Sequence, residues 1–185
     1  MDDLEAFERA SDGFGARLGE VRGEHWALPT PCEGWNVRTL VDHVVRHDQI
    51  VPRYIAGERY SDMRLPDDVL GEDPVAVWRS SRDAALTAFR GDGALQAVVH
   101  HELSDINGEL LLFFRFSDNL LHTWDLARAI GGDEKLDPEL VELCLERTLP
   151  FADYVASTGR FGTRIDVAED ADVQTQLLAL HGRRS

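Results

Sequence analysis

The segment of residues 111–130 most constrains the fold, because it is apolar around nearly its whole circumference when it is projected as a helix. Within the segment, Arg115, Asp118, His122 and Asp125 form one polar stripe. Such a stripe ordinarily faces solvent. A helix that is apolar on all its other sides must nevertheless be covered by other segments, and titratable groups buried there need partners or a metal ion. The segment therefore predicts a central helix in a helical protein.

Charge and hydropathy limit the binding partners that the whole chain can have. The chain carries 34 acidic and 19 basic residues, which give a formal net charge of −15, so a phosphate backbone would be repelled and no nucleic-acid partner is expected. No run of 18 apolar residues is present, so we expect no membrane segment. A small-molecule substrate and a homodimer both remain compatible with this charge.

Length and cysteine content favour one cytoplasmic domain over residues 1–185. A chain of 185 residues is close to the usual size of one domain. The N-terminus is acidic where a secretory signal would be basic. Cys32 and Cys144 form no Cys-x-x-Cys pair, so the sequence predicts neither a disulfide framework nor a cysteine zinc site.

Apolar residues spaced by three and four predict the remaining helices. The predicted helices cover residues 2–21, 37–57, 74–90, 111–130 and 137–157, with closing helical turns at 173–181. Asn36 is a cap for the second helix, and Pro74 and Pro138 suit first-turn positions. Residues 94–112 predict either a short hairpin, in which residues 98–99 and 110–112 flank a turn, or an extended loop, and residues 161–167 predict a short strand.

Two pairs of residues on the predicted helices are candidate metal ligands. His43 and His47 lie at the edge of the apolar face of residues 37–57, where a histidine is more often a hydrogen-bonded boundary residue than a ligand. Asp118 and His122 are four positions apart and can hold one ion from one helix face, although the same spacing also forms simple helix-stabilising contacts. A third ligand from a facing helix would complete an open site.

Three stretches of the chain resemble one known family. The first is Thr-Pro-Cys-Glu-Gly-Trp-Asn-Val-Arg-Thr-Leu-Val-Asp-His at residues 30–43, and the second joins Asp118 to His-Thr-Trp-Asp-Leu-Ala-Arg at residues 122–128. The third includes Phe-Gly at residues 161–162 and Leu-Leu-Ala-Leu-His-Gly-Arg at residues 177–183. In this order they resemble DinB-like proteins of the mycothiol-dependent maleylpyruvate isomerase group.

The resemblance implies an all-α, up-down-down-up four-helix bundle that holds a divalent metal, most often zinc or nickel, between its second and fourth helices. The implied ligands are His43, Asp118 and His122. Asp118 stands where the characterised isomerase carries Glu, so its carboxylate is shorter by one methylene. His47 matches no ligand position of the family, and Asp125 is placed to orient His122 or a bound water. A structural role is expected for Cys32.

The function that the resemblance implies is metal-dependent chemistry on a low-molecular-weight thiol such as mycothiol, as in a transferase or isomerase. The full isomerase has a further C-terminal domain, so we expect the bundle domain alone here. The alternatives are a non-catalytic module that binds a metal or small ligand, and a metal-assisted hydrolase. A cavity beside the metal would favour an enzyme, whereas a fourth ligand such as His47 would favour a binding module.

Overall fold

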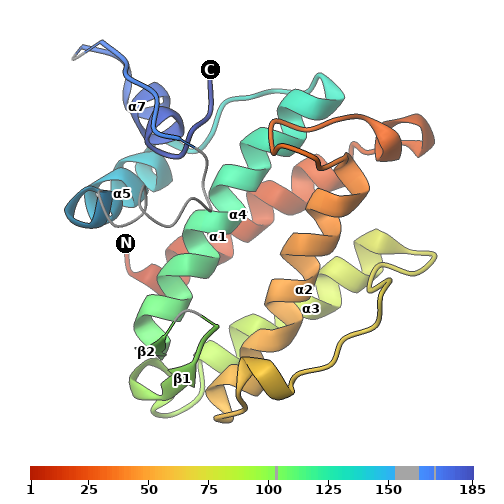
Figure 1. Cartoon of the computed structure of the whole chain (residues 1–185), viewed down its shortest axis with the longest axis vertical. Coiled ribbons are helices and arrows are strands. Elements are labelled where there is room, and N and C mark those ends of the chain that lie inside the picture. The colour runs from red at the N-terminus through yellow and green to blue at the C-terminus, as the bar shows by residue number, and fades with distance from the viewer. Residues whose placement is uncertain (103, 153–162, 169) are drawn as a thin grey trace. The chain divides into compact units, whose positions relative to one another are not determined.

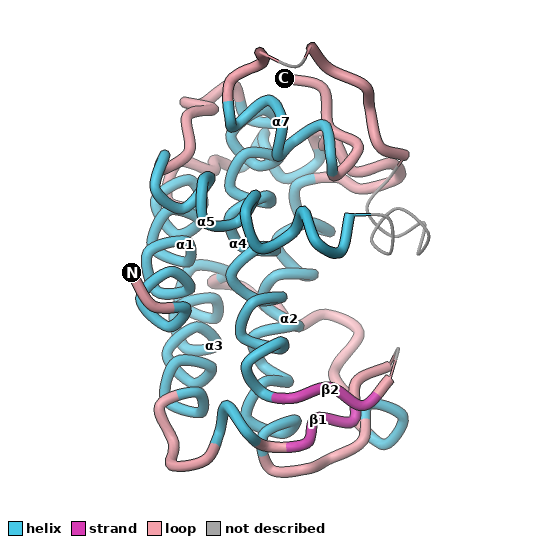
Figure 2. Tube along the Cα trace, turned by 90° about the vertical axis from the view of Figure 1, so that its left-hand side faces the viewer, coloured by secondary structure: helices cyan, strands magenta, loops and turns pink. Residues whose placement is uncertain are grey.

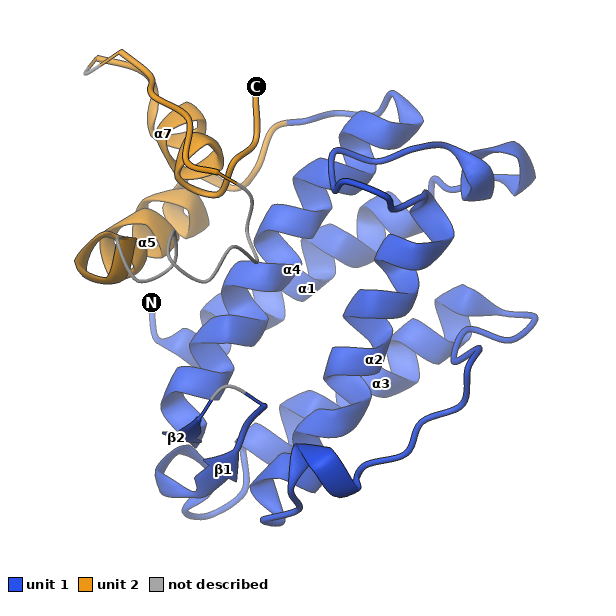
Figure 3. Cartoon of the chain, viewed as in Figure 1, with its two compact units in different colours: residues 1–134 blue, residues 135–185 orange. Residues whose placement is uncertain are grey.

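A computed structural model describes residues 1–185 except residues 103, 153–162 and 169. The described chain forms two compact units, Met1–Glu134 and Lys135–Ser185, which Figure 3 shows in blue and orange. Each unit is described by itself below, and the single domain expected over residues 1–185 stays a prediction.

The first unit is a bundle of four helices. The helices are α1 (Asp3–Leu18), α2 (Val37–Ile55), α3 (Pro74–Phe89) and α4 (Gly108–Ile130). Helix α1 packs against α4 and α3, and α2 packs against α3 and α4. Figure 1 shows α1 and α4 rising in the view while α2 and α3 descend. The predicted all-α, up-down-down-up bundle is therefore confirmed.

The long connection of residues 56–73 follows from this helix order. Helices α2 and α3 run in the same direction side by side, so the chain must return along the length of a helix before α3 begins. A helix of 16 residues, the length of α3, spans about 24 Å, which no tight turn can cover. The connection, which contains Gly57, Pro66 and Gly71, supplies this length.

Side-chain caps set the starts of the helices. The Asn36 side chain accepts a hydrogen bond from the Thr39 backbone N–H at 2.9 Å, as the sequence predicts for the start of α2. Asp73 caps α3 in the same way ahead of Pro74. Helix α4 ends at Gly131, which adopts a left-handed conformation with φ of 71°.

The hairpin before α4 differs from the prediction in its second strand. Strand β1 (Val98–His100) pairs antiparallel with β2 (Asp105–Asn107), and residues 110–112, the predicted partner, belong to α4. Asn107 explains the difference, because its side chain accepts a hydrogen bond from the Leu110 N–H at 2.9 Å and begins the helix there. Figure 2 shows the hairpin at one end of the four helices.

Helix α4 is buried on nearly every side, including most of its polar stripe. Arg115 is 4% exposed, His122 is 5% exposed and Asp125 is fully buried. The stripe therefore faces protein and not solvent, which is the less common of the two arrangements weighed above. No helix in the described part of the chain is both long enough and apolar enough to cross a membrane.

The second unit contains α5 (Pro138–Thr148), followed by a short 3-10 turn at Leu149–Phe151, and α7 (Val173–Leu180). Helices α5 and α7 pack against each other. Asp137 caps α5, as the Asp-Pro pair predicts. The predicted end of this helix near residue 157 lies outside the described residues. The strand predicted at 161–167 is wrong for its described part, because residues 163–167 form no strand.

One close contact fixes the spacing of α1 and α3. A Cβ atom added at Gly15 would lie 2.1 Å from Cη2 of the Trp78 indole, whereas a Cβ at Gly13 would meet only Thr123 atoms at 3.9 Å. Trp78 is 7% exposed, so its ring has little room to move. The absence of a side chain at residue 15 is what lets the indole lie against α1.

We expect Gly15→Ala to lower the free energy of unfolding by about 1–2 kcal/mol, because overpacking against Trp78 outweighs the gain in helix propensity. Gly13→Ala is the matched control on the same helix and should raise stability by roughly 0.5–1 kcal/mol. Urea unfolding of both variants measures the difference. Equal stabilisation by the two changes would contradict the close packing of α1 on α3.

Candidate metal centre

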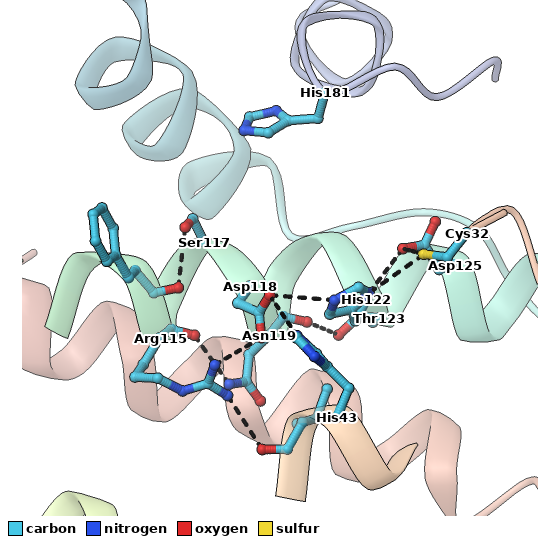
Figure 4. A network of polar contacts seen from close by, with 12 residues as sticks. Cys32, His43, Arg115, Ser117, Asp118, Asn119, His122, Thr123, Asp125 and His181 are labelled. Carbon is cyan, nitrogen blue, oxygen red and sulfur yellow. Dashed lines mark hydrogen bonds and ion pairs between the residues drawn. The ribbon is translucent and has the colours of Figure 1, made fainter. Parts of the chain in front are cut away.

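Three side chains from two helices converge inside the first unit. His43 Nε2, on α2, lies 3.3 Å from Asp118 Oδ1, on α4. His122 Nε2 lies 3.2 Å from the same oxygen. One donor atom from each of the three residues lies within 4.8 Å of the others, close enough to share one ion (Figure 4). The structure thus brings together the three ligands predicted from the sequence.

Helix register explains why these side chains meet. His43 lies at the edge of the buried face of α2, between Leu40 and Val44, and its side chain is 24% exposed. Asp118 and His122 are one helical turn apart on α4, so they lie on the same face of that helix. Packing of α2 against α4 then places the imidazole of His43 opposite both of them.

A buried arginine holds the second oxygen of Asp118. Arg115 donates from Nη1 to Asp118 Oδ2 at 2.7 Å, from Nε to Asp48 Oδ1 at 3.0 Å and from Nη2 to the Val44 carbonyl at 3.3 Å. Asp118 therefore presents only Oδ1 to the two histidines. Arg115 also ties α4 to α2, because both Asp48 and Val44 lie on α2.

Asp48 was not selected in the sequence analysis, although it is fully buried. The signal for it was available, because Asp48 lies four residues after Val44 and three after Val45, on the spacing of the apolar face. Burial raises the pKa of Asp48, and the neighbouring Arg115 opposes that change. An acid at an apolar-face position indicates a buried partner of opposite charge.

The other ring nitrogen of His122 faces a second carboxylate. His122 Nδ1 lies 2.9 Å from Asp125 Oδ2, and the Cys32 thiol donates to the same oxygen at 3.4 Å. A carboxylate behind a metal-binding histidine fixes the ring orientation and the tautomer that presents Nε2. Asp125 thus occupies the orienting position expected from the sequence, whereas the contact of Cys32 was not anticipated.

Burial and neighbouring charges shift the titration of the site. Burial alone would raise the pKa of Asp118, but His43, His122 and Arg115 hold it well below its ordinary value. Burial lowers the pKa of His43, and Asp118 offsets only part of that change. Burial alone would also lower the pKa of His122, yet Asp118 and Asp125 raise it well above its ordinary value. The centre therefore combines an ionised carboxylate at Asp118, a neutral imidazole at His43 and an imidazole at His122 that favours its protonated form.

His47 lies next to the centre but outside the group of three donors. Its ring centroid is 4.4 Å from that of His43. Burial lowers the pKa of His47 well below its ordinary value, and the nearby His43 adds to this change. His47 also lines a cavity of about 290 Å³, whose other lining residues are Arg46, Ile50, Tyr60, Ser61, Met63, Arg64 and Leu65. His47 thus lies beside His43 and also lines this cavity.

Two tryptophans in the stretches that resemble the family have different surroundings. The Trp35 ring centroid is 4.8 Å from that of His43 and 5.8 Å from that of His122, so its indole covers both imidazoles. Trp124 is 1% exposed and belongs to the buried core. Trp35 is thus the wall of the site, and Trp124 is a packing residue.

The donor set fits a divalent ion. Two imidazole nitrogens and one carboxylate oxygen are ligands that zinc and nickel accept, and such a set of three leaves coordination positions open. The Asp118 carboxylate, which is 18% exposed, supplies negative charge to offset the cation, and Asp125 supplies the outer support for His122. These residues therefore satisfy both the inner and the outer requirements of a three-ligand site.

Comparison with known proteins shows the family to which the chain belongs. The profile of a family described as the mycothiol maleylpyruvate isomerase N-terminal domain matches residues 7–127, which include all three candidate ligands. Two uncharacterized proteins of Mycobacterium tuberculosis, from strains CDC 1551 and H37Rv, are each 36% identical over 140 residues, covering 76% of this chain and 74% of theirs. No solved structure matches the chain significantly.

We expect His43→Ala and His122→Ala each to abolish stoichiometric metal binding, because an open site with two remaining ligands holds an ion weakly. His47→Ala should retain most of the metal, and Asp118→Asn should bind it more weakly because the offsetting charge is lost. Elemental analysis of the purified variants measures the content. Full metal content in His43→Ala or His122→Ala would rule out this centre.

We expect Arg115→Met to lower the free energy of unfolding by about 3–5 kcal/mol, because it leaves Asp48 and Asp118 buried without their counter-charge. Arg90→Met is the control, since Arg90 forms an exposed pair with Glu8 and should contribute about 1 kcal/mol or less. Urea unfolding of both proteins in the presence of chelator gives the comparison. A loss at Arg115 no larger than at Arg90 would contradict a structural role for the buried pair.

Proposed function

Because the chain belongs to the mycothiol maleylpyruvate isomerase N-terminal domain family, we propose that it is a metal-dependent enzyme acting on a low-molecular-weight thiol such as mycothiol. The reaction would be a transfer of the thiol to an electrophile or an isomerisation assisted by it. The observation that carries the proposal is the convergence of His43, Asp118 and His122 on one point with positions left open.

The residues of the centre have distinct roles in this proposal. His43, Asp118 and His122 would hold a divalent ion, zinc or nickel by their donor chemistry. Such an ion acts as a Lewis acid that lowers the pKa of a thiol or water it holds, which makes a nucleophile at neutral pH. Asp125 keeps the His122 ring in one orientation, and the Trp35 indole lies beside both imidazoles.

The cavity beside His47 supports an enzyme more than a closed metal site. Its volume of about 290 Å³ is at the lower end of small-molecule sites. Its lining combines apolar side chains, such as Ile50 and Met63, with polar ones, such as Tyr60 and Arg64. The ring of His47 lies beside that of His43 and also lines this cavity. A substrate held in the cavity would therefore lie close to the centre.

A non-catalytic metal-binding module is a second candidate, and one observation favours it. Asp118 already contacts His43, His122 and Arg115, so the buried charges are compensated within the protein. Such a network can serve stability or metal storage without a reaction. Metal-assisted hydrolysis would use the same ligands, with water in place of the thiol.

A thiol-transfer assay separates these functions. We expect the metal-loaded chain to accelerate reaction of mycothiol with at least one member of an electrophile panel, and chelation or His122→Ala to reduce the rate by at least about 100-fold, equivalent to about 3 kcal/mol of transition-state stabilisation. Restoring the ion to the chelated protein should restore the rate. Metal uptake with no turnover of any electrophile or ester would instead support the binding module.

A further inference from the structure

The Nδ1 side of His122 faces a second set of potential ligands. Nδ1 lies 2.9 Å from Asp125 Oδ2 and 4.0 Å from Cys32 Sγ, and the sulfur lies 3.4 Å from the same oxygen. These sulfur, nitrogen and oxygen atoms lie within 4.8 Å of one another (Figure 4). We propose that Cys32, His122 and Asp125 form a separate site for a thiophilic cation such as Cd²⁺, and that an ion there excludes one at the centre of His43 and Asp118.

The local structure of the loop places the sulfur for this role. The Thr30 hydroxyl accepts a hydrogen bond from the Cys32 N–H at 3.2 Å, and the Cys32 carbonyl accepts one from the Trp35 N–H at 3.0 Å. The loop that carries Cys32 is therefore held on both sides of the residue. Cys32 is partly exposed, so an ion can reach it, while Cys144, the other cysteine of the chain, is buried within α5.

The chemistry of the two donor sets differs in one atom type. A thiolate is the softest ligand that a protein supplies and selects soft cations, whereas imidazole and carboxylate suit zinc, nickel and harder ions. Binding at Cys32 forms a bond from sulfur to the cation and releases the thiol proton to solvent. Asp125 and His122 then complete the set with an oxygen and a nitrogen. The second set should therefore prefer Cd²⁺ over Ni²⁺.

The shared ring makes the two sites exclusive. A neutral imidazole has one nitrogen that can donate a lone pair and one that carries hydrogen. Each nitrogen of His122 has a carboxylate oxygen beside it, Asp118 Oδ1 at 3.2 Å from Nε2 and Asp125 Oδ2 at 2.9 Å from Nδ1. Either nitrogen can thus keep the hydrogen while the other binds a cation. The exclusion of one ion by the other rests on the metal centre proposed above. The donor set of Cys32, His122 and Asp125 does not depend on that centre.

Titration of the full chain with Cd²⁺, followed by the sulfur-to-cadmium charge-transfer absorption, tests the site. We expect wild type to develop this absorption with one equivalent of ion. Cys32→Ser should lose this absorption and bind Cd²⁺ more than about 100-fold more weakly. That loss is larger than the one expected when a residue that only orients a ligand is changed. Cys144→Ala is the matched control and should keep both. Absorption that survives in Cys32→Ser, or that wild type never shows, would overturn the proposal.

Competition between ions tests the exclusion. Elemental analysis of wild type given Ni²⁺ and Cd²⁺ together should find one ion per chain, and Cd²⁺ should displace bound Ni²⁺. Two ions per chain would overturn the exclusion. His43→Ala keeps the two hypotheses apart, since it should lose Ni²⁺ and retain the cadmium absorption. If wild type shows the Cys32-dependent absorption but binds no Ni²⁺, the second site stands and the proposed metal centre fails.

Discussion

The partly buried carboxylate of Asp118 is the charge around which the first unit is organised. One oxygen of Asp118 accepts a hydrogen bond from Arg115, and the other faces His43 and His122. This one carboxylate therefore contacts His43 on α2 as well as Arg115 and His122 on its own helix α4. An unpaired carboxylate in such a place would cost several kcal/mol, and the charge of the neighbouring Arg115 offsets part of that cost. The same arrangement places one carboxylate oxygen and two imidazole nitrogens within 4.8 Å of one another, close enough to share one ion.

The order of the helices makes this arrangement possible. A short turn would join α2 to an antiparallel neighbour, but the long connection of residues 56–73 lets α3 run beside α2 in the same direction. The chain then passes through the hairpin of β1 and β2 and turns back as α4, which packs against both α1 and α2. The polar stripe of α4 is consequently enclosed by other helices, and its titratable groups must pair with residues from them.

His122 connects the proposed function to the proposed second site. Its two nitrogens face different carboxylates, one on each side of the ring, so either nitrogen can keep a hydrogen-bond partner while the other binds an ion. With Asp125 as the outer partner, Nε2 would be available to the proposed centre of His43 and Asp118. With Asp118 as the outer partner, Nδ1 would be available beside the sulfur of Cys32. In these proposals the choice of cation would decide which carboxylate binds metal and which one orients the ring.

The sequence by itself determined the features that depend on neighbouring residues: the periodic faces of the helices, the caps at Asn36 and Asp137, and the pairing of Asp118 with His122 across one turn. It misplaced β2, because three leucines suit a strand as well as the buried first turn of α4. Only the tertiary structure decided that the polar stripe faces inward, and that Asp48 and Cys32 contact it from 67 and 93 residues away. Periodicity reports which side of a helix is apolar, whereas the partner of each side depends on how distant segments pack.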